Sequence, residues 1–375
     1  MLSAGQGREI VHLFGGVVGG PHVVTLSFAA CAGISPKASP PADAIAGFPN
    51  SDSPSVVFAP GRIKEHRMNS SVLDTPATSR QLDTTFTRRA RYRSGENGFD
   101  FTWSDVPIRQ FLAERDRAFD AAASTGLIVL DSSDVLGNGI VATTPTLLCR
   151  YVRLRSGESL GTRFLGSGEI YYAMAGSGES RNGADSIGWC AGDVFCFPGG
   201  GDTMHRAGST HCVLFSVTDE PLAAYLGLRS AGQDAAVLAT THWPAEEIEA
   251  RFDAVWSRPI TARTTGASVQ FTSAELAPSY NTTRTINCAI NTLAVDSDQR
   301  PHRHNGVAVT LAIEGEGIHS MIDGQRVDWS TGAAQITPAT RLHSHHNHGP
   351  RRMRSFVIQD EGLHFYTRTV GFSFE

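Results

Sequence analysis

The feature that most constrains the fold is an internal duplication of the sequence. The stretch from Gly332 to His343 repeats the residue spacing of the stretch from Gly192 to Thr203. The number of residues that separates the two copies is the same at both ends of the stretch. Both copies break into short apolar runs separated by glycine and proline, a pattern typical of β-strands. Because each copy of such a repeat forms one structural unit, the chain is predicted to contain two related, mainly β domains.

The C-terminal copy contains a pattern of histidines typical of a metal site. His302 and His304 are two residues apart, so on a β-strand both imidazoles point to the same face. The pair Asp323-Gly324 between apolar runs predicts a tight turn, which folds the following segment back and brings His343 beside the other two histidines. Three neutral imidazoles that converge in this way can bind a divalent transition metal.

Both copies resemble the two signature motifs of the cupin superfamily, Gly-x5-His-x-His-x3,4-Glu-x6-Gly and Gly-x5-Pro-x-Gly-x2-His-x3-Asn. The residues of the C-terminal copy that fall in register are His302, His304, Gly315, Gly332, Pro338, His343 and Asn347. Ala308 stands in place of the motif glutamate, and Asp296 in place of its first glycine. The residues of these stretches are most similar to those of the gentisate 1,2-dioxygenase branch, which also lacks the glutamate and holds iron with three histidines.

This resemblance implies a mainly β fold of two tandem cupin barrels (double-stranded β-helix, or jelly-roll, barrels) joined by a few helices. The N-terminal copy keeps the motif spacing but not the ligands. At the three ligand positions it has Arg163, Leu165 and Thr203, and of the motif only Glu169 remains. One carboxylate cannot replace three imidazoles, so no metal is expected in this copy. His205 is interpreted as a structural or interfacial residue.

The composition and charge of the chain limit the functions that it can have. The net charge is −5, the pI is near 6.3 and long basic runs are lacking, which argues against nucleic-acid binding. The apolar stretch from Val11 to Gly33 is interrupted by glycines and Pro21, so no membrane span is expected. Six scattered cysteines without a Cys-x-x-Cys pair are interpreted as free thiols of a cytoplasmic protein. A weak cleavage-site pattern around Cys31 leaves export as the alternative.

The chain is divided into five expected segments. Residues 1–67 are rich in Pro, Ser, Ala and Gly and are interpreted as disordered, or as an extension upstream of a natural start at Met68. The remaining segments are an N-terminal arm and helix at 68–135, a barrel without metal ligands at 136–228, a helical connector at 229–262 and a metal-binding barrel at 263–375. Helices are predicted from Ile108 to Ser124, Pro221 to Leu228 and Trp243 to Trp256.

The resemblance implies an Fe(II) ion held by His302, His304 and His343, although Mn, Ni or Zn suits the same ligands. His345 lies two residues beyond the last ligand and is expected to face the cavity as a hydrogen-bond partner or base; alternatively it only orients that ligand. Thr310 replaces an arginine that binds a carboxylate in the gentisate and salicylate enzymes. The residues expected to bind substrate are Gln299, Thr310, Asn347 and Arg341.

The resulting hypothesis is an Fe(II)-dependent, extradiol-type ring-cleaving dioxygenase that acts with O2 on a hydroxylated aromatic acid similar to gentisate or salicylate. Since burial of an unpaired carboxylate is costly, such a substrate needs another cation, from Arg303, Arg341, Arg352 or Arg354, or direct coordination to the metal. Two alternatives remain open: a metal-dependent hydrolase, isomerase or decarboxylase of a small polar metabolite, and a non-enzymatic bicupin that binds a small ligand. A homodimer or homotetramer is expected by analogy with other cupins.

Overall fold

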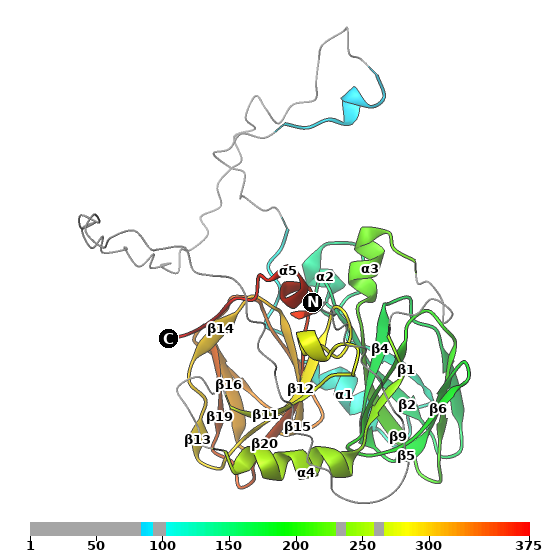
Figure 1. Ribbon diagram of the computed structural model, residues 1–375, viewed down its shortest axis with the longest axis vertical. Coiled ribbons are helices and arrows are strands. Elements are labelled where there is room, and N and C mark those ends of the chain that lie inside the picture. Colours follow the sequence, from blue (N-terminus) through cyan, green and yellow to red (C-terminus); the bar gives the residue numbers. More distant parts are fainter. Residues whose placement is uncertain (1–83, 93–102, 230–237, 259–265) are drawn as a thin grey trace, which may run out of the picture. The chain divides into compact units, whose positions relative to one another are not determined.

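The computed structural model describes residues 84–92, 103–229, 238–258 and 266–375 (Figure 1). The expected extension at 1–67, the start at Met68 and most of the N-terminal arm lie outside these ranges. The chain divides into two units, residues 1–93 and 94–375. The described part of the first unit contains the short 3-10 helix η3 (Thr87–Arg89), whose arginines are exposed. The second unit contains both barrels.

The first barrel consists of two antiparallel sheets whose strand order differs from the chain order, as in a jelly roll (Figure 1). The larger sheet contains, in spatial order, β1 (Gly126–Val129), β2 (Leu148–Leu154), β9 (Cys212–Thr218), β4 (Gly168–Ala175), β7 (Val194–Pro198) and β10 (Thr241–Trp243). The second sheet contains β3 (Ser159–Thr162), β8 (Thr203–Ala207), β5 (Ser177–Asn182) and β6 (Asp185–Cys190).

The second barrel repeats this arrangement, and the mainly β fold expected from the sequence is confirmed. One sheet contains β11 (Ala267–Phe271), β12 (Asn287–Leu293), β20 (Met353–Gln359), β15 (Ala308–Glu314) and β18 (Ala334–Thr337). The other contains β17 (Gln325–Asp328), β16 (Ile318–Ile322), β19 (His343–Asn347), β14 (His302–His304) and β21 (Phe372–Phe374), with β13 (Ser297–Asp298) paired to β19. Asp323 and Gly324 both have positive φ, so the predicted tight turn between β16 and β17 is confirmed.

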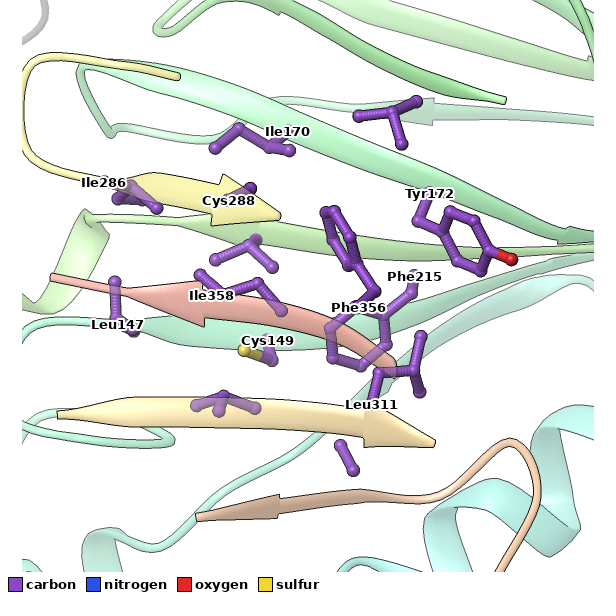
Figure 2. Close-up of a cluster of buried hydrophobic side chains, with 14 of the residues drawn as sticks. Leu147, Cys149, Ile170, Tyr172, Phe215, Ile286, Cys288, Leu311, Phe356 and Ile358 are labelled. Atoms are coloured by element: carbon purple, nitrogen blue, oxygen red, sulfur yellow. The ribbon is translucent and has the colours of Figure 1, made fainter. Parts of the chain in front are cut away.

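The two barrels share one hydrophobic core, formed where the sheet of the first barrel that contains β2, β9 and β4 packs against the sheet of the second that contains β12, β20 and β15 (Figure 2). Ile170, Tyr172 and Phe215 come from the first barrel, and Phe356 and Ile358 from the second. The rings of Tyr172 and Phe356 stack with centroids 5.3 Å apart. Strand β9 is buried on both faces, which explains its nearly continuous apolar sequence.

The interiors of the two barrels differ in what fills them. The first barrel is filled by large aromatic side chains, which are Phe164, Tyr171, Trp189, Phe195 and Phe197. Tyr171 pairs with Phe195 across β4 and β7, and the corresponding pair across β15 and β18 is Thr310 and Gln335. Smaller polar side chains thus take the place of aromatic rings in the second barrel, and this leaves room for a cavity there.

The positions in the first barrel that correspond to the candidate metal ligands differ by one residue from those expected. Motif spacing aligns Arg163 and Leu165 with the ligand histidines, and this alignment is wrong. Thr162 pairs with Thr203 across β3 and β8, as the matching histidines do in the second barrel. Thr162 and Phe164 point inward and are buried, whereas Leu165 is 54% exposed. The inward residues are therefore two threonines and a phenylalanine, which are not ligands of transition metals.

Five α-helices and a second 3-10 helix join the strands in the described ranges: α1 (Leu112–Phe119), α2 (Ser133–Leu136), α3 (Glu220–Leu226), α4 (Ala245–Trp256), η6 (Ala277–Ser279) and α5 (Gly362–Thr367). Three of them, α1, α3 and α4, lie where the sequence predicts helices. In these ranges, no helix is long and apolar enough to cross a membrane.

The helix predicted from Ile108 to Ser124 is shorter at both ends. Residues 109–111 are extended, because their backbone pairs with the free edge of β18: the N–H of Phe111 donates to the carbonyl of Ala334, at 2.9 Å. At the other end, the carbonyl groups of residues 121–123 accept hydrogen bonds from the guanidinium groups of Arg153 and Arg155. Tertiary hydrogen bonds therefore take backbone groups that an isolated helix would use.

Candidate metal centre

Two neighbouring strands of the second barrel bring the three candidate ligands together. His302 and His304 lie on β14, and His343 lies directly opposite His302 on β19. One ligand atom from each of the three side chains lies within 4.8 Å of the others, and all three residues are buried. The two-residue spacing on β14 points both imidazoles into the barrel, as the sequence predicts.

Each of these imidazoles is oriented by a backbone carbonyl group. The Nδ1 atoms of His302 and His343 lie 3.1 and 2.9 Å from the carbonyl oxygens of Arg300 and Arg341, two residues earlier. The Nδ1 atom of His304 lies 2.8 Å from the carbonyl oxygen of Gly306. A carbonyl can only accept, so Nδ1 carries the proton and Nε2 has a free lone pair. This is the arrangement that metal-binding histidines use.

Burial keeps these imidazoles neutral. It lowers the pKa of His304 to about 4 and, together with the neighbouring histidines, that of His343 to about 2. The pKa of His302 is also lowered, mainly by burial. A neutral imidazole is the form that binds a metal, so no proton has to be displaced at neutral pH.

A cavity of about 340 Å³ opens beside the three Nε2 atoms. Of the other site residues predicted from the sequence, Gln299, Thr310 and His345 line it. Asn347 and Arg341 do not. The amide of Asn347 is buried and donates to three backbone carbonyl groups, so its role here is structural. The guanidinium of Arg341 lies at the surface with Asp323 and Asp105.

Several cavity residues were missed by sequence reasoning. Four further carboxamide side chains line it, together with one carboxyl group: Gln270, Asn287, Asn291, Gln359 and Glu361. Burial, followed by the charge of Asp360, raises the pKa of Glu361 to about 7. The alternation of polar and apolar residues along β12 is a signal that could have identified the two asparagines, because alternate residues share a face.

Among the residues that the structure describes, those that line the cavity include neither lysine nor arginine. The arginines considered from the sequence are placed elsewhere among the described residues. Arg303 approaches Glu375, Arg354 pairs with Glu249, and the guanidinium of Arg352 lies over the ring of Trp256. A carboxylate bound in the cavity therefore meets amides, hydroxyls and imidazoles of this chain but no cationic side chain.

The C-terminal strand β21 covers one side of the site. It pairs with β14 on the edge opposite β19. The ring of Phe372 stacks on His302, with centroids 5.3 Å apart, and it also lines the cavity. This contact limits the access of water to the ligand imidazole.

The donor set fits a divalent transition metal. The three Nε2 lone pairs converge, and the imidazoles are neutral and fixed in orientation. The side-chain amide of Gln359 lies 3.1 Å from Nε2 of His304, so its N–H donates to the lone pair that a metal would use. If His304 held a metal through Nε2, this hydrogen bond would be lost and the amide of Gln359 would be available to the cavity.

Comparison with known proteins relates both the sequence and the fold to cupins. Residues 290–359 match the family described as Cupin domain. A stretch of 138 residues is 35% identical to a 5-aminosalicylate 1,2-dioxygenase from Comamonas sp. This match covers 34% of the chain and 36% of that relative, so it spans about a third of the relative's length.

The fold is similar to that of solved structures over a larger part of the chain than the sequence match covers. A salicylate 1,2-dioxygenase from Pseudaminobacter salicylatoxidans superposes with a TM-score of 0.62 at 12% identity, over 76% of this chain and 93% of that one. The same enzyme with gentisate adducts gives 0.61 at 12% identity, over 75% and 88% of the two chains. At this level of identity the likeness establishes the fold of both barrels.

Proposed function

We propose that the chain is a two-barrel cupin and that its second barrel is the active site of a ring-cleaving dioxygenase. The substrates are one hydroxylated aromatic carboxylic acid, similar to gentisate or a salicylate, and O2. The observation that carries this proposal is the set of three buried, neutral imidazoles whose Nε2 atoms meet at a cavity. The partial sequence match to 5-aminosalicylate 1,2-dioxygenase supports this class of reaction.

We assign the metal to His302, His304 and His343, and we favour Fe(II). Bound Fe(II) would pass electrons from an electron-rich ring to dioxygen, which is chemistry that the protein side chains lack. Three neutral imidazoles leave the charge of the ion uncompensated. This is the positive charge that an anionic substrate requires, since the described residues of the cavity lining include no lysine or arginine.

The remaining cavity residues are suited to a small polar aromatic ring. A volume of about 340 Å³ lies at the lower end of the range of ligand pockets, roughly 300–1,000 Å³, and suits a compact ligand. Gln299, Thr310 and Asn291 offer hydrogen bonds to ring substituents, while Val357 and Phe372 provide apolar contacts. Recognition of the carboxylate through the metal distinguishes this arrangement from one that uses an arginine.

The test is oxygen uptake by the full chain after anaerobic loading with Fe(II). The panel consists of gentisate, salicylate, 5-aminosalicylate and 1-hydroxy-2-naphthoate. We expect stoichiometric uptake and a new ring-opened absorbance with at least one of them. His304→Ala should lose bound iron and activity together. His348→Ala is the matched control, because this histidine follows the same strand as His343 but is exposed and pairs with Asp298.

Iron binding without oxygen uptake across the panel would refute the proposal and point to an oxygen-independent reaction of a hydrolase, isomerase or decarboxylase. Equal activity in His304→Ala would refute the assignment of the metal ligands. A homodimer or homotetramer and a cytoplasmic location stay predictions, which sedimentation and fractionation can check.

A further inference from the structure

His345 is part of a buried hydrogen-bond network that has a counterpart in the first barrel. In the second barrel, the hydroxyl oxygen of Ser320 lies 2.9 Å from Nδ1 of His345 and accepts the indole N–H of Trp329 at 2.7 Å. In the first barrel, Ser180, His205 and Trp189 make the same contacts, each at 2.8 Å. All three pairs of positions have the offset of the internal duplication, so the network belongs to the repeated unit.

The second barrel adds one donor to this network. The side-chain amide of Gln335 donates to the hydroxyl oxygen of Ser320 at 2.7 Å. The residue at the matching position of the first barrel is Phe195, which cannot donate a hydrogen bond. The hydroxyl of Ser320 therefore has three partners, whereas that of Ser180 has two in the described part of the chain.

With the amide of Gln335 oriented to donate to Ser320, counting protons in this network gives the tautomer of His345. A hydroxyl has two lone pairs and one proton. Trp329 and Gln335 both donate to Ser320, so they occupy both lone pairs. The hydroxyl proton must then point to Nδ1 of His345, which accepts it and is itself unprotonated. In the neutral imidazole the proton is consequently on Nε2.

We infer that Ser320, Trp329 and Gln335 are positioning residues that hold His345 as a hydrogen-bond donor, with its Nε2–H directed into the cavity. His345 lines the cavity, and Nε2 lies on the side of the ring opposite Ser320. This tautomer is the reverse of that of the three ligand histidines, whose protons are on Nδ1. Of the four neighbouring imidazoles, the network thus makes one a hydrogen-bond donor through Nε2, while the other three keep Nε2 free to bind a metal.

Two roles of His345 are excluded by this arrangement. A general base needs a free lone pair, and so does a fourth metal ligand; the lone pair on Nδ1 is taken by Ser320, and Nε2 carries a proton. His345 instead donates to an oxygen atom of the bound substrate, such as a carboxylate or phenolate oxygen. The inference rests on the proposed function only for the identity of this acceptor.

In the first barrel the corresponding imidazole, that of His205, is fully buried among other side chains. Nε2 of His205 lies 3.4 Å from the hydroxyl of Thr162, and the ring packs edge-on against Tyr171. The Trp–Ser–His network is therefore a structural unit of both barrels, and Gln335 adapts it to function in one of them. This provides an internal control for the experiment.

The test reads the proton position directly. Full-length protein with 15N-labelled histidine side chains is loaded with Zn(II). Two-bond 1H–15N correlation spectra then identify the tautomer of His345. The signal of His345 is assigned by its absence from the spectrum of His345→Gln. We expect the Nε2–H pattern in the wild type and loss of this single pattern in Gln335→Met. Ser180→Ala should leave it unchanged. A wild-type Nδ1–H pattern, which a reversed Gln335 amide would produce, overturns the inference.

Ligand binding separates a donor from a base. A glutamine side chain places its N–H where the imidazole has Nε2. The zinc-loaded His345→Gln variant should therefore bind salicylate with an affinity within about threefold of that of the wild type. His345→Leu, which has no donor, should bind roughly tenfold more weakly. Equal weakening in both variants contradicts the donor role. Failure of the proposed ring cleavage would appear in oxygen uptake and would leave the proton position unaffected.

Discussion

Buried histidines occur in both barrels but in different surroundings. His205 is fully buried between Ser180, Thr162 and the ring of Tyr171, and burial lowers its pKa to about 3. An unfolded histidine has a pKa near 6.5. Between these two values the unfolded chain binds a proton that the folded chain does not, so stability falls as the pH falls.

We therefore expect acid to destabilise the protein partly through His205. Lowering the pH from 7 to 5 should cost about 2 kcal/mol at this residue, since each unit of pH below about 6.5 contributes ~1.4 kcal/mol. Urea unfolding at both pH values measures the loss of stability in the wild type and in His205→Gln, which has no titrating group at this position. The loss should be smaller in the variant by the contribution of His205.

The nearby carboxyl of Glu169, whose pKa is raised to about 7 by burial, acts in the opposite direction. It is common to both proteins, so it cancels in the comparison. An equal loss of stability in the wild type and the variant would show that His205 does not titrate on unfolding.

At the scale of the element, pairs of strands decide which residues can share a metal ion. In the first barrel β3 and β8 hold the positions that β14 and β19 hold in the second. Glu169 lies beside them: its carboxylate accepts the hydroxyl proton of Thr203 at 2.8 Å, and its other oxygen has no hydrogen-bond partner among the described residues. The strands of the first barrel thus offer the geometry of a metal site without its imidazoles.

Restoring imidazoles at the inward positions should create a second metal site. We expect the triple variant Thr162→His, Phe164→His, Thr203→His to bind two zinc ions per chain, while the wild type binds one. The matched control replaces the residues that align by sequence, Arg163→His and Leu165→His together with Thr203→His, and should stay at one. Metal analysis after exhaustive dialysis gives the stoichiometry, and circular dichroism verifies folding. A second ion in the control but not in the inward variant would refute the strand register.

At the scale of the whole molecule, the barrels of the second unit depend on each other. They share the core of Figure 2, and each also uses backbone from a connecting segment: residues 109–111 pair with β18, and β10 pairs with β7. Tyr151 of the first barrel also donates its hydroxyl proton to the carbonyl of Gly332 in the second. Shared burial of this kind couples the folding of both barrels.

Phe356 lies at the centre of this shared core and is fully buried. Phe356→Ala should lower the free energy of unfolding by about 3–5 kcal/mol, the usual cost of removing a buried ring. Because the core is common, we expect one urea transition, shifted as a whole in both tryptophan fluorescence and circular dichroism. Tyr172→Phe, which keeps the stacked ring, should shift it little. Two separate transitions, with only one of them moved, would show that the barrels unfold independently.

Local patterns in the sequence were sufficient for the fold class and for the three candidate metal ligands, which the structure brings together. The His-x-His spacing, the turn at Asp323 and the internal repeat can each be read directly along the chain, and the structure places them as expected. Alternate residues of a strand share a face, so two candidate ligands that are two residues apart on one strand both point inward.

Only the tertiary structure decided which strand faces were inward in the first barrel and which polar residues reached the cavity. A shift of one residue reverses every side chain of a strand, and without histidines no local feature fixed the alignment at Thr162. The carboxamides of Gln270, Asn291 and Gln359 come from three different strands, and pairing between distant strands is not encoded in any one of them. Their convergence, like the proton order at His345, depends on contacts that form only when the barrel closes.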